Sequence, residues 1–345
     1  MSDVPSDVTG KAFIAPSSAR RRALLKAGAA AVAMSGSGVL HAQTWKPAKA
    51  IEIVIGTSPG GPQDRMGRAV QRIIQEKKLV DVPVNVVNRP GGGGAIAMSY
   101  LNTHPGDPHY VAVNAITTLT NQITGKTQQG PNDFTPLSIM GVEYVAVAVR
   151  SDSPLRSAKE LVERLRKEPG SMSIAVGTAL GNATHLSFAL AMRAAGVDIR
   201  KMRTVVFGSG GEALTALLGG HIDAAASAPS NVLAQTRAGQ LRMIAIGAPS
   251  RLAGELSAIP TWKEIGINSY FDLWRGIAGP RGLTPAHIAF WDRVLGAVAT
   301  GPEWKQELEK NDLENVYKNS AETARHWKTE YDEVRAVLVE LGLAR

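Results

Sequence analysis

Short segments rich in valine and isoleucine alternate with amphipathic segments along most of the chain after residue 50. This alternation restricts the possible folds more than any other feature. Each short segment is bounded by Gly, Pro, Ser or Asp, which is typical of β-strands that end in turns. Strands that alternate with helices indicate an α/β fold with parallel sheets. The predicted strands are 51–55, 83–88, 110–114, 143–150, 172–176, 203–207, 222–227, 241–246 and 272–278.

The segments between these strands carry helical signals. Apolar side chains repeat at the spacing of one helical face between residues 64 and 78. Residues 157–168 form another predicted helix, which begins with Ser157 as a candidate N-cap and ends before Pro169-Gly170. Two long amphipathic helices, at about 285–311 and 320–342, are predicted to close the chain.

The character of the sequence changes near residues 141–150 and again in the Pro/Gly-punctuated stretch 247–272. A compact α/β set lies between these two places. We therefore predict a second domain, 143–270, inserted into a first domain made of 43–142 and 271–345. Two crossing segments would then connect the domains, and such a layout makes a cleft and a hinge.

The first 42 residues have the order of a secretory signal. Arg20-Arg21-Arg22 precede a small-residue apolar stretch from Ala27 to Leu40, and a plausible cleavage point follows Ala42. The order R-R-A-L-L-K indicates a twin-arginine-like signal and a periplasmic location. A disordered basic tail and an uncleaved anchor are the alternatives. The apolar stretch is short for a membrane span. The later apolar runs are also shorter than the length that a bilayer requires.

Composition excludes several classes of function. The chain has no cysteine, so disulfides and thiol chemistry are ruled out. The first 42 residues hold five Lys or Arg and two Asp, so the remaining chain carries a formal charge of +5 instead of +8. Basic residues are not interleaved with aromatic ones, and we therefore do not expect nucleic-acid binding. A mildly basic exported protein suits small anionic ligands.

The loop after the first predicted strand spells G-x-S-x-G, from Gly56 to Gly60, like the nucleophile elbow of α/β-hydrolases. The residue after Ser58 is Pro59, which lacks the backbone N–H that an oxyanion hole needs. An exported serine hydrolase that uses Ser58 is therefore kept only as the alternative function. Glycines before a helix N-terminus instead suit anion binding, with Asp64 as a candidate helix cap. An ordinary strand–helix turn without a ligand would have the same sequence pattern.

The second loop repeats this arrangement. Strand 83–88 is followed by Asn88-Arg89-Pro90, four consecutive glycines and a helix. Four glycines cost backbone entropy, which folding must offset elsewhere. Loops of two adjacent parallel strands would face each other at the carboxyl end of the sheet, where such folds bind ligands. Neither loop contains the lysine of a P-loop, so nucleoside triphosphate hydrolysis is not expected.

Two further loops lie in the predicted inserted domain. Residues 208–213 spell G-x-G-x-x-A, but the acidic residue of a dinucleotide site is missing from the end of the next strand. A ligand-facing loop and a structural turn are the remaining alternatives. Residues 177–184 offer small polar side chains before a helix that contains His185. We interpret His185 as a packing or capping residue, and the scattered histidines predict no metal site.

Five runs of sequence together resemble the Bug/TctC family of periplasmic substrate-binding receptors of tripartite tricarboxylate transporters. The resemblance covers almost all of the chain after the signal segment, and its most specific parts are "NRPGGGG" and the order of the runs. The runs are "SPGGPQDRMGRAVQ", "VVNRPGGGGAIA", "AVGTALGNATHL", "LLGGHID" and "PTWKEIG…WRGIAGP". The resemblance implies a type II-like Venus flytrap of two α/β domains, without catalytic residues or a cofactor.

The resemblance further implies a small carboxylate ligand, held between the two glycine-rich loops and covered by the second domain. It implies a monomer whose partners are membrane transporter subunits or a sensor kinase. Pro62 stands where the family usually has a third glycine in the first loop. The departures leave the identity of the ligand open. The residues carried over as ligand-binding are Ser58, Gly60, Gly61, Asp64, Arg89, Pro90, Gly91, Gly92, Ala95, Thr178, Asn182, Thr184 and Ser209.

Overall fold

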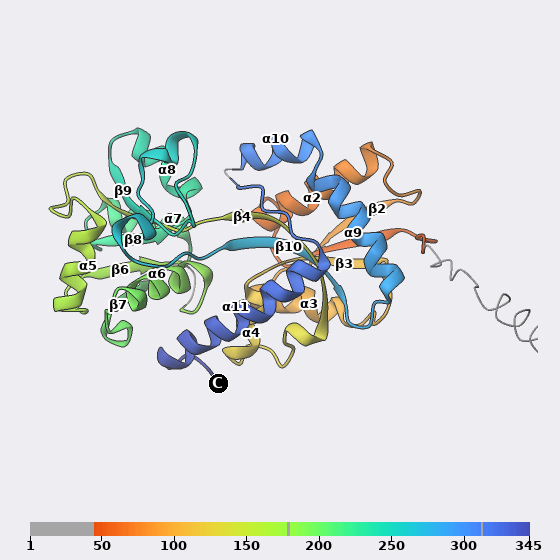
Figure 1. Ribbon diagram of the computed structural model, residues 1–345, viewed down its shortest axis with the longest axis horizontal. Coiled ribbons are helices and arrows are strands. Elements are labelled where there is room, and N and C mark those ends of the chain that lie inside the picture. Colours follow the sequence, from red (N-terminus) through yellow and green to blue (C-terminus); the bar gives the residue numbers. More distant parts are fainter. Residues whose placement is uncertain (1–44, 178–179, 312) are drawn as a thin grey trace, which may run out of the picture. The chain divides into compact units, whose positions relative to one another are not determined.

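The computed structural model describes residues 45–177, 180–311 and 313–345. Helices alternate with the strands of two five-stranded sheets (Figure 1), so the predicted α/β class is confirmed. The predicted signal segment 1–42 and the candidate ligand residue Thr178 lie outside the described residues. None of the described helices combines the length and the apolar character that crossing a membrane requires.

The first sheet has the order β2-β1-β3-β10-β4. Its first three strands are parallel, whereas β10 is antiparallel to both β3 and β4. The sheet is therefore mixed and not purely parallel. Its strands are β1 (Ile51–Ile55), β2 (Val84–Asn88), β3 (Tyr110–Ala115), β4 (Phe134–Glu143) and β10 (Leu273–Pro280).

The second sheet has the order β7-β6-β8-β5-β9 and repeats this plan. Strands β7, β6 and β8 are parallel, and β5 is antiparallel to β8 and β9. Its strands are β5 (Ala146–Arg150), β6 (Ser173–Val176), β7 (Arg203–Val206), β8 (Ala224–Ser227) and β9 (Leu241–Ile246). Its helices are α5 (Ala158–Lys167), α6 (Ala183–Ala194), α7 (Gly210–Leu218) and α8 (Pro229–Arg237).

Two predicted elements were wrong. The single strand expected at 143–150 is two strands, since β4 ends at Glu143 and β5 begins at Ala146. Strand β4 was not predicted over most of its length because it contains Pro136, which cannot donate to a strand ladder. This proline is tolerated because β4 lies at the edge of the sheet.

The expected helix 285–311 is also two elements, α9 (Pro285–Ala299) and α10 (Pro302–Lys310). The break falls at Gly301-Pro302, where the proline ring disfavours a helical conformation of the preceding residue. The helix predicted at 157–168 is α5, and the predicted cap is confirmed because the Ser157 side chain accepts a hydrogen bond from the Glu160 N–H.

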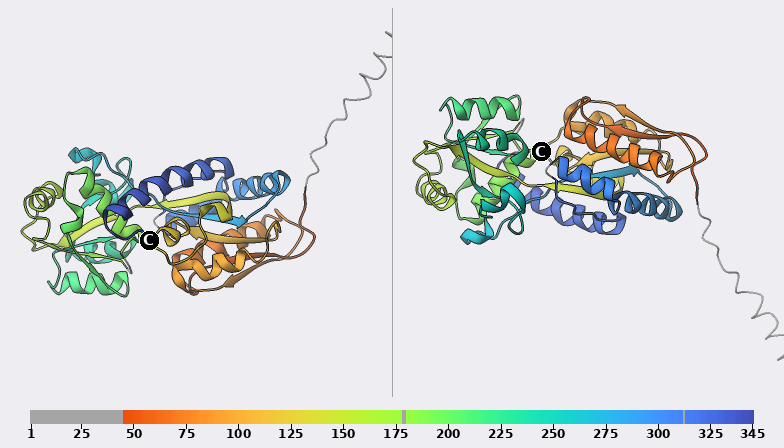
Figure 2. Two further views of the ribbon diagram at one scale, coloured as in Figure 1. Left: turned by 90° about the horizontal axis from the view of Figure 1, so that it is seen from below. Right: turned by 90° about the horizontal axis from the view of Figure 1, so that it is seen from above.

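Helices cover both faces of the first sheet (Figure 2). The alternate residues Ile51, Ile53 and Ile55 pack with α2 (Pro62–Glu76), α9 and α10, whose Trp291 and Trp304 are fully buried. On the other face, Val54 and Ala112 belong to the cluster with α3 (Ala95–Leu101), α4 (Thr117–Ile123) and α11 (Ser320–Glu340). Burial of both faces explains why these strands read as almost continuous apolar runs.

The last helix, α11, packs along β4 and α4 and also reaches α6 of the second sheet. Leu338 lies beside Gly181, where an added Cβ would stand 3.0 Å from the leucine methyl group. Nearby, Arg193 of α6 forms an ion pair with Glu340 at 2.9 Å. The C-terminal helix therefore contacts elements of both sheets.

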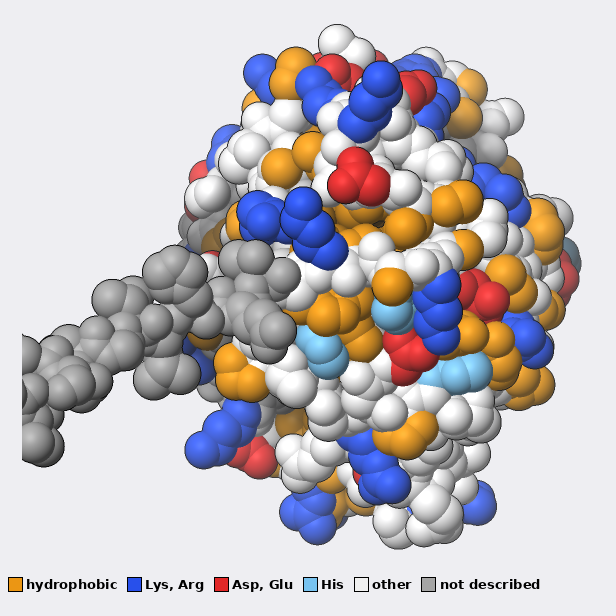
Figure 3. All heavy atoms as spheres, turned by 90° about the vertical axis from the view of Figure 1, so that its right-hand side faces the viewer, with side chains coloured by type: hydrophobic (Ala, Val, Ile, Leu, Met, Phe, Trp, Pro, Cys, Tyr) orange, Lys and Arg blue, Asp and Glu red, His pale blue; other side chains and the backbone are white. Residues whose placement is uncertain are grey.

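The described chain begins at Trp45, whose ring packs against His109 and Phe290 with centroid distances of 5.1 and 4.7 Å. This contact fixes the first described residues to α9. On the face shown in Figure 3, positive and negative side chains are interspersed with apolar ones.

Candidate ligand-binding site

The first glycine-rich loop, 56–61, joins β1 to α2. The predicted capping of α2 by the Asp64 side chain was wrong, because the N-cap is Gly61 and makes no side-chain cap. Asp64 lies in the first turn of the helix, and its carboxylate reaches back to accept the Gly60 N–H at 2.9 Å. The side chain therefore shapes the loop and leaves the N-terminus of α2 free of a side-chain cap.

The Asp64 carboxylate is buried and accepts several hydrogen bonds. Arg68 donates from Nε to both oxygens, and Asn88 donates from Nδ2 at 2.8 Å. Burial opposes the charged form, but the bonds from Arg68, Gly60 and Asn88 outweigh it and hold the pKa of Asp64 below its ordinary value. Asp64 thus stays ionised, and its hydrogen bonds hold the loop in place. Because the side chain is buried, it is not exposed to a ligand.

The second loop, 89–94, lies directly beside the first. A Cβ added to Gly56 would stand only 2.8 Å from the Cα of Gly94, so the two backbones touch. All four glycines, 91–94, have positive φ. Asn121 of α4 donates to the carbonyl oxygens of Gly92 and Gly93. The predicted proximity of the two loops at the carboxyl end of the sheet is confirmed.

These loops present backbone donors. Within the described residues, the N–H groups of Ser58, Gly92 and Gly93 have no hydrogen-bond acceptor. All three residues are exposed, and the α2 N-terminus adds its positive dipole end nearby. Successive free backbone N–H groups of this kind form concave sites for anions. Of the other predicted residues, Gly61 and Ala95 are half-buried and Pro90 and Gly91 are exposed.

Arg89 does not extend from the loop tip. Its guanidinium stacks over the Tyr100 ring of α3 at 3.5 Å from the ring centroid. The Arg89 backbone N–H donates to Ile55 and continues the pairing of β2 with β1. In this conformation Arg89 supports the base of the second loop.

The predicted polar residues of the second sheet cap its helices. Asn182 is the N-cap of α6, and its Oδ1 accepts from the His185 N–H and the Thr184 hydroxyl, both at 2.9 Å. The same hydroxyl accepts the Gly177 N–H. Ser209 is the N-cap of α7 and accepts the Glu212 N–H at 3.2 Å. Within the part of the chain that the structure describes, Asn182 Nδ2 and the Ser209 hydroxyl hydrogen have no acceptor and can serve as neutral donors.

His185 is a buried capping residue, as predicted. Its Nδ1 accepts the Gly181 N–H at 2.9 Å, which fixes the turn before α6. Burial lowers the pKa of His185 from 6.5 to about 4. The ring is therefore neutral at pH 7.

We expect His185 to make stability pH-dependent. The unfolded chain takes up the proton near pH 6.5 and the folded chain only near pH 4, so stability falls as the pH falls through this window. The full loss is about 3 kcal/mol. His185→Gln should weaken this dependence in urea unfolding at pH 7.0 compared with about pH 4.5. An equal pH dependence in both proteins would contradict the assignment.

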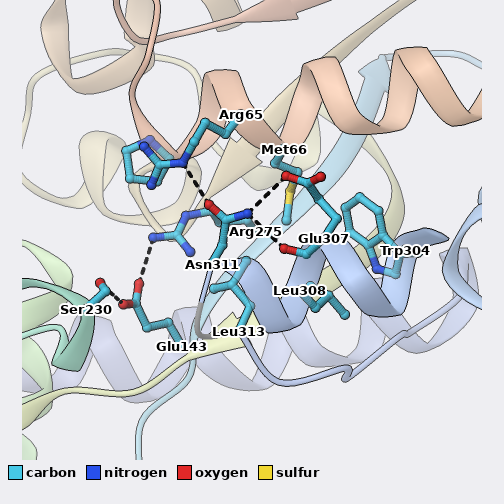
Figure 4. Close-up of a pocket in the computed structure, with 11 residues that line it drawn as sticks. Arg65, Met66, Glu143, Ser230, Arg275, Trp304, Glu307, Leu308, Asn311 and Leu313 are labelled. Carbon is cyan, nitrogen blue, oxygen red and sulfur yellow. Dashed lines mark hydrogen bonds and ion pairs between the residues drawn. The ribbon is translucent and has the colours of Figure 1, made fainter. Parts of the chain in front are cut away.

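A small cavity lies next to the first loop, where the chain crosses between the sheets (Figure 4). Arg275 of β10 forms an ion pair with Glu143 at 3.0 Å, and Ser230 of α8 donates to Glu143 at 2.7 Å. Arg65 donates to the Gly60 carbonyl oxygen and to Asn311. The cavity volume of about 30 Å³ accommodates only a few waters, so we do not assign the ligand to it.

Sequence analysis missed several residues that shape the site. The i,i+4 spacing of Asp64 and Arg68 on one helix was a usable signal. The charges of Glu143 and Arg275 within apolar strands were a second signal, because a buried charge in a strand requires a partner. Asn88 and Asn121 offered no such signal, since their partners lie on other elements.

The comparisons with known proteins agree with this architecture. The model of the tripartite tricarboxylate transporter family receptor matches residues 67–343. Protein BugT of Bordetella pertussis is 27% identical over 257 residues, which are 72% of this chain and 76% of BugT. A TctC solute binding protein from Polaromonas is 25% identical with a TM-score of 0.75, over 86% of this chain and 99% of the other.

A structure of an R. palustris protein with adipate has the same fold, at 22% identity and a TM-score of 0.70, over 86% of this chain and 99% of the other. The fold is thus that of two-domain periplasmic solute-binding proteins, as predicted. The family match covers far more than half of the chain. The chain belongs to the receptor family of tripartite tricarboxylate transporters, the Bug/TctC family.

Proposed function

We propose that this protein is an extracytoplasmic receptor that binds one small carboxylate ligand and delivers it to a tripartite tricarboxylate-type membrane transporter. The observation that carries the proposal is the contact of two glycine-rich loops that present unpaired backbone N–H groups. Neutral backbone donors can hold a carboxylate without an ion pair, and the α2 dipole adds a favourable field. Adipate in the R. palustris structure supports a carboxylate ligand.

In the proposed mechanism the ligand carboxylate accepts hydrogen bonds from the unpaired N–H groups of Ser58 in the first loop and of Gly92 and Gly93 in the second. The domain made of 143–270 closes over the remainder of the ligand by rotation at its two crossings. The β4–β5 and β9–β10 connections support this division, because they are the two links between the sheets. Hinge closure of this kind encloses ligands in many binding proteins.

We further propose that residues 1–42 direct export to the periplasm. The twin-arginine-like order in 20–26 and the small residues before Gln43 support this. N-terminal sequencing of protein recovered from the periplasm should then begin at Gln43. Recovery of the intact N-terminus from the cytoplasm would refute export.

A thermal-shift screen tests the receptor function. Small carboxylates should raise the melting temperature of the purified protein, whereas the matched amides or alcohols should not. A ligand at about 100 times its dissociation constant stabilises the folded state by about 2.7 kcal/mol. Equal shifts by a carboxylate and its amide, or a shift by dinucleotides only, would refute the carboxylate site.

The alternative of an exported hydrolase rests on Ser58. Its side chain is exposed, and within the described residues it forms no hydrogen bond with a histidine. We expect the purified protein and Ser58→Ala to hydrolyse p-nitrophenyl acetate equally, at the background rate. A turnover that Ser58→Ala removes would support the hydrolase instead.

A further inference from the structure

Basic side chains near the two glycine-rich loops already have partners. The exposed Arg65 side chain donates to the Gly60 carbonyl oxygen and to Asn311 at the end of α10, both at 2.8 Å. The others contact an acid or an aromatic ring: Arg68 with Asp64, Arg275 with Glu143, and Arg89 with Tyr100. A second anionic group on the ligand would have to compete with these contacts.

The loops at the carboxyl edge of the second sheet are uncharged. Their described parts are Gly177 and Leu180–Asn182 after β6, Phe207–Gly211 after β7 and Ser227–Asn231 across the β8–α8 turn. The first acid that follows, Glu212, points back and accepts the Gly208 N–H at 3.0 Å. This edge therefore offers neutral donors and apolar surface to whatever part of the ligand meets it.

Some exposed apolar side chains follow the glycine-rich loop of the first sheet or lie at the carboxyl edge of the second sheet. Ile96 follows the second glycine loop and is 54% exposed, while Leu180 in the loop after β6 and Val206 at the end of β7 are each 41% exposed. Only two further large apolar side chains of the described chain, Tyr270 and Val339, are comparably exposed. Large apolar side chains that are exposed beside a predicted site favour an apolar contact for its ligand.

From these observations we infer that the ligand is a monocarboxylate with an uncharged, mainly apolar remainder, such as an alkanoate or arylalkanoate. This inference rests on the proposed receptor function and refines its substrate class. The loops of the first sheet hold the single carboxylate, and Leu180 and Val206 contact the remainder. A second carboxylate, or the ammonium of an amino acid, would lose its hydration at the second sheet without a charged partner.

Isothermal titration of the purified protein with matched pairs tests the inference. The pairs are butanoate with succinate, hexanoate with adipate, and octanoate with suberate, which differ only in the terminal carboxylate. At each length that binds, we expect the monocarboxylate to bind at least about tenfold more tightly, because a desolvated unpaired charge is costly.

Equal or tighter binding of the dicarboxylates would overturn this inference and leave the receptor function intact. If no member binds and carboxylates at large give no thermal shift, the receptor function itself is wrong and the inference falls with it. The two failures are therefore distinguishable.

Val206→Lys provides a second test at the edge of the second sheet. A cation there should improve the affinity for adipate relative to hexanoate by up to about fivefold, as expected for a partly exposed ion pair. Val339→Lys, on the exposed surface of α11, adds the same charge elsewhere and should leave the ratio unchanged. An unchanged ratio in Val206→Lys, or an equal rise in both variants, would contradict the contact.

Discussion

Asp64→Ala should lower the free energy of unfolding by about 2–4 kcal/mol, since it removes a buried carboxylate and leaves its donors unsatisfied. The Gly60 N–H and the Asn88 amide lose an acceptor at 2.9 and 2.8 Å. The expected loss lies at the lower end of the usual cost of breaking a buried ion pair, because the Arg68 side chain is half exposed and can be solvated by water instead. Urea denaturation at pH 7 measures the change.

Glu76→Ala is the matched control for this substitution. Glu76 is an acid of the same helix, its side chain is 56% exposed, and among the described residues it forms an ion pair with Arg72 alone. Exposed pairs of this kind contribute about 0–1 kcal/mol. If Asp64→Ala and Glu76→Ala unfold at the same urea concentration, Asp64 does not brace the loop as the structure indicates.

Gly56→Ala should reduce the affinity for a carboxylate ligand by about 10- to 100-fold. The new methyl group would stand 2.8 Å from the Cα of Gly94, and backbone cannot move aside as a flexible side chain can. The two loops must separate, which costs about 1–3 kcal/mol and changes the spacing of their N–H donors. Titration with the best carboxylate from the thermal-shift screen measures the loss.

Gly170→Ala is the control for an added methyl group. It lies in the turn before β6, where the nearest atom to an added Cβ is at 3.4 Å, an ordinary contact. Circular dichroism should show both variants folded, so that a loss of binding can be assigned to the loops. Unchanged affinity in folded Gly56→Ala would mean that the ligand does not bind between them.

The sequence allowed the glycine loops to be predicted because their signals are local. Each loop follows a Val/Ile-rich strand and precedes a helix, and parallel neighbours place such loops at one edge. The structure adds the contact between Gly56 and Gly94, which the arrangement of the strands does not specify. The fold class was predictable for the same reason, although the antiparallel directions of β10 and β5 were not.

The directions of the polar side chains could not be predicted. Arg89 was expected at the ligand, but the Tyr100 ring on the next helix attracts its guanidinium. Asn182 and Ser209 were expected to select the ligand, and the free N–H groups of the helices behind them take their oxygens. Each of these side chains turns to a helix N–H donor or to a ring that is in place only once the helix has formed. A sequence motif therefore predicts the position of a loop more reliably than it predicts the role of each side chain in that loop.

The contact of α11 with α6 has a consequence for affinity. If the loops of the second sheet turn toward the ligand, Gly181 and Arg193 must shift against Leu338 and Glu340. The strength of this contact then sets the fraction of molecules whose second-sheet loops are turned toward the ligand, which is the binding-competent conformation. A competent fraction of about one tenth weakens apparent binding about tenfold. Substitutions on the C-terminal helix could thus adjust how tightly the protein holds its ligand, while the choice of ligand stays with the loops.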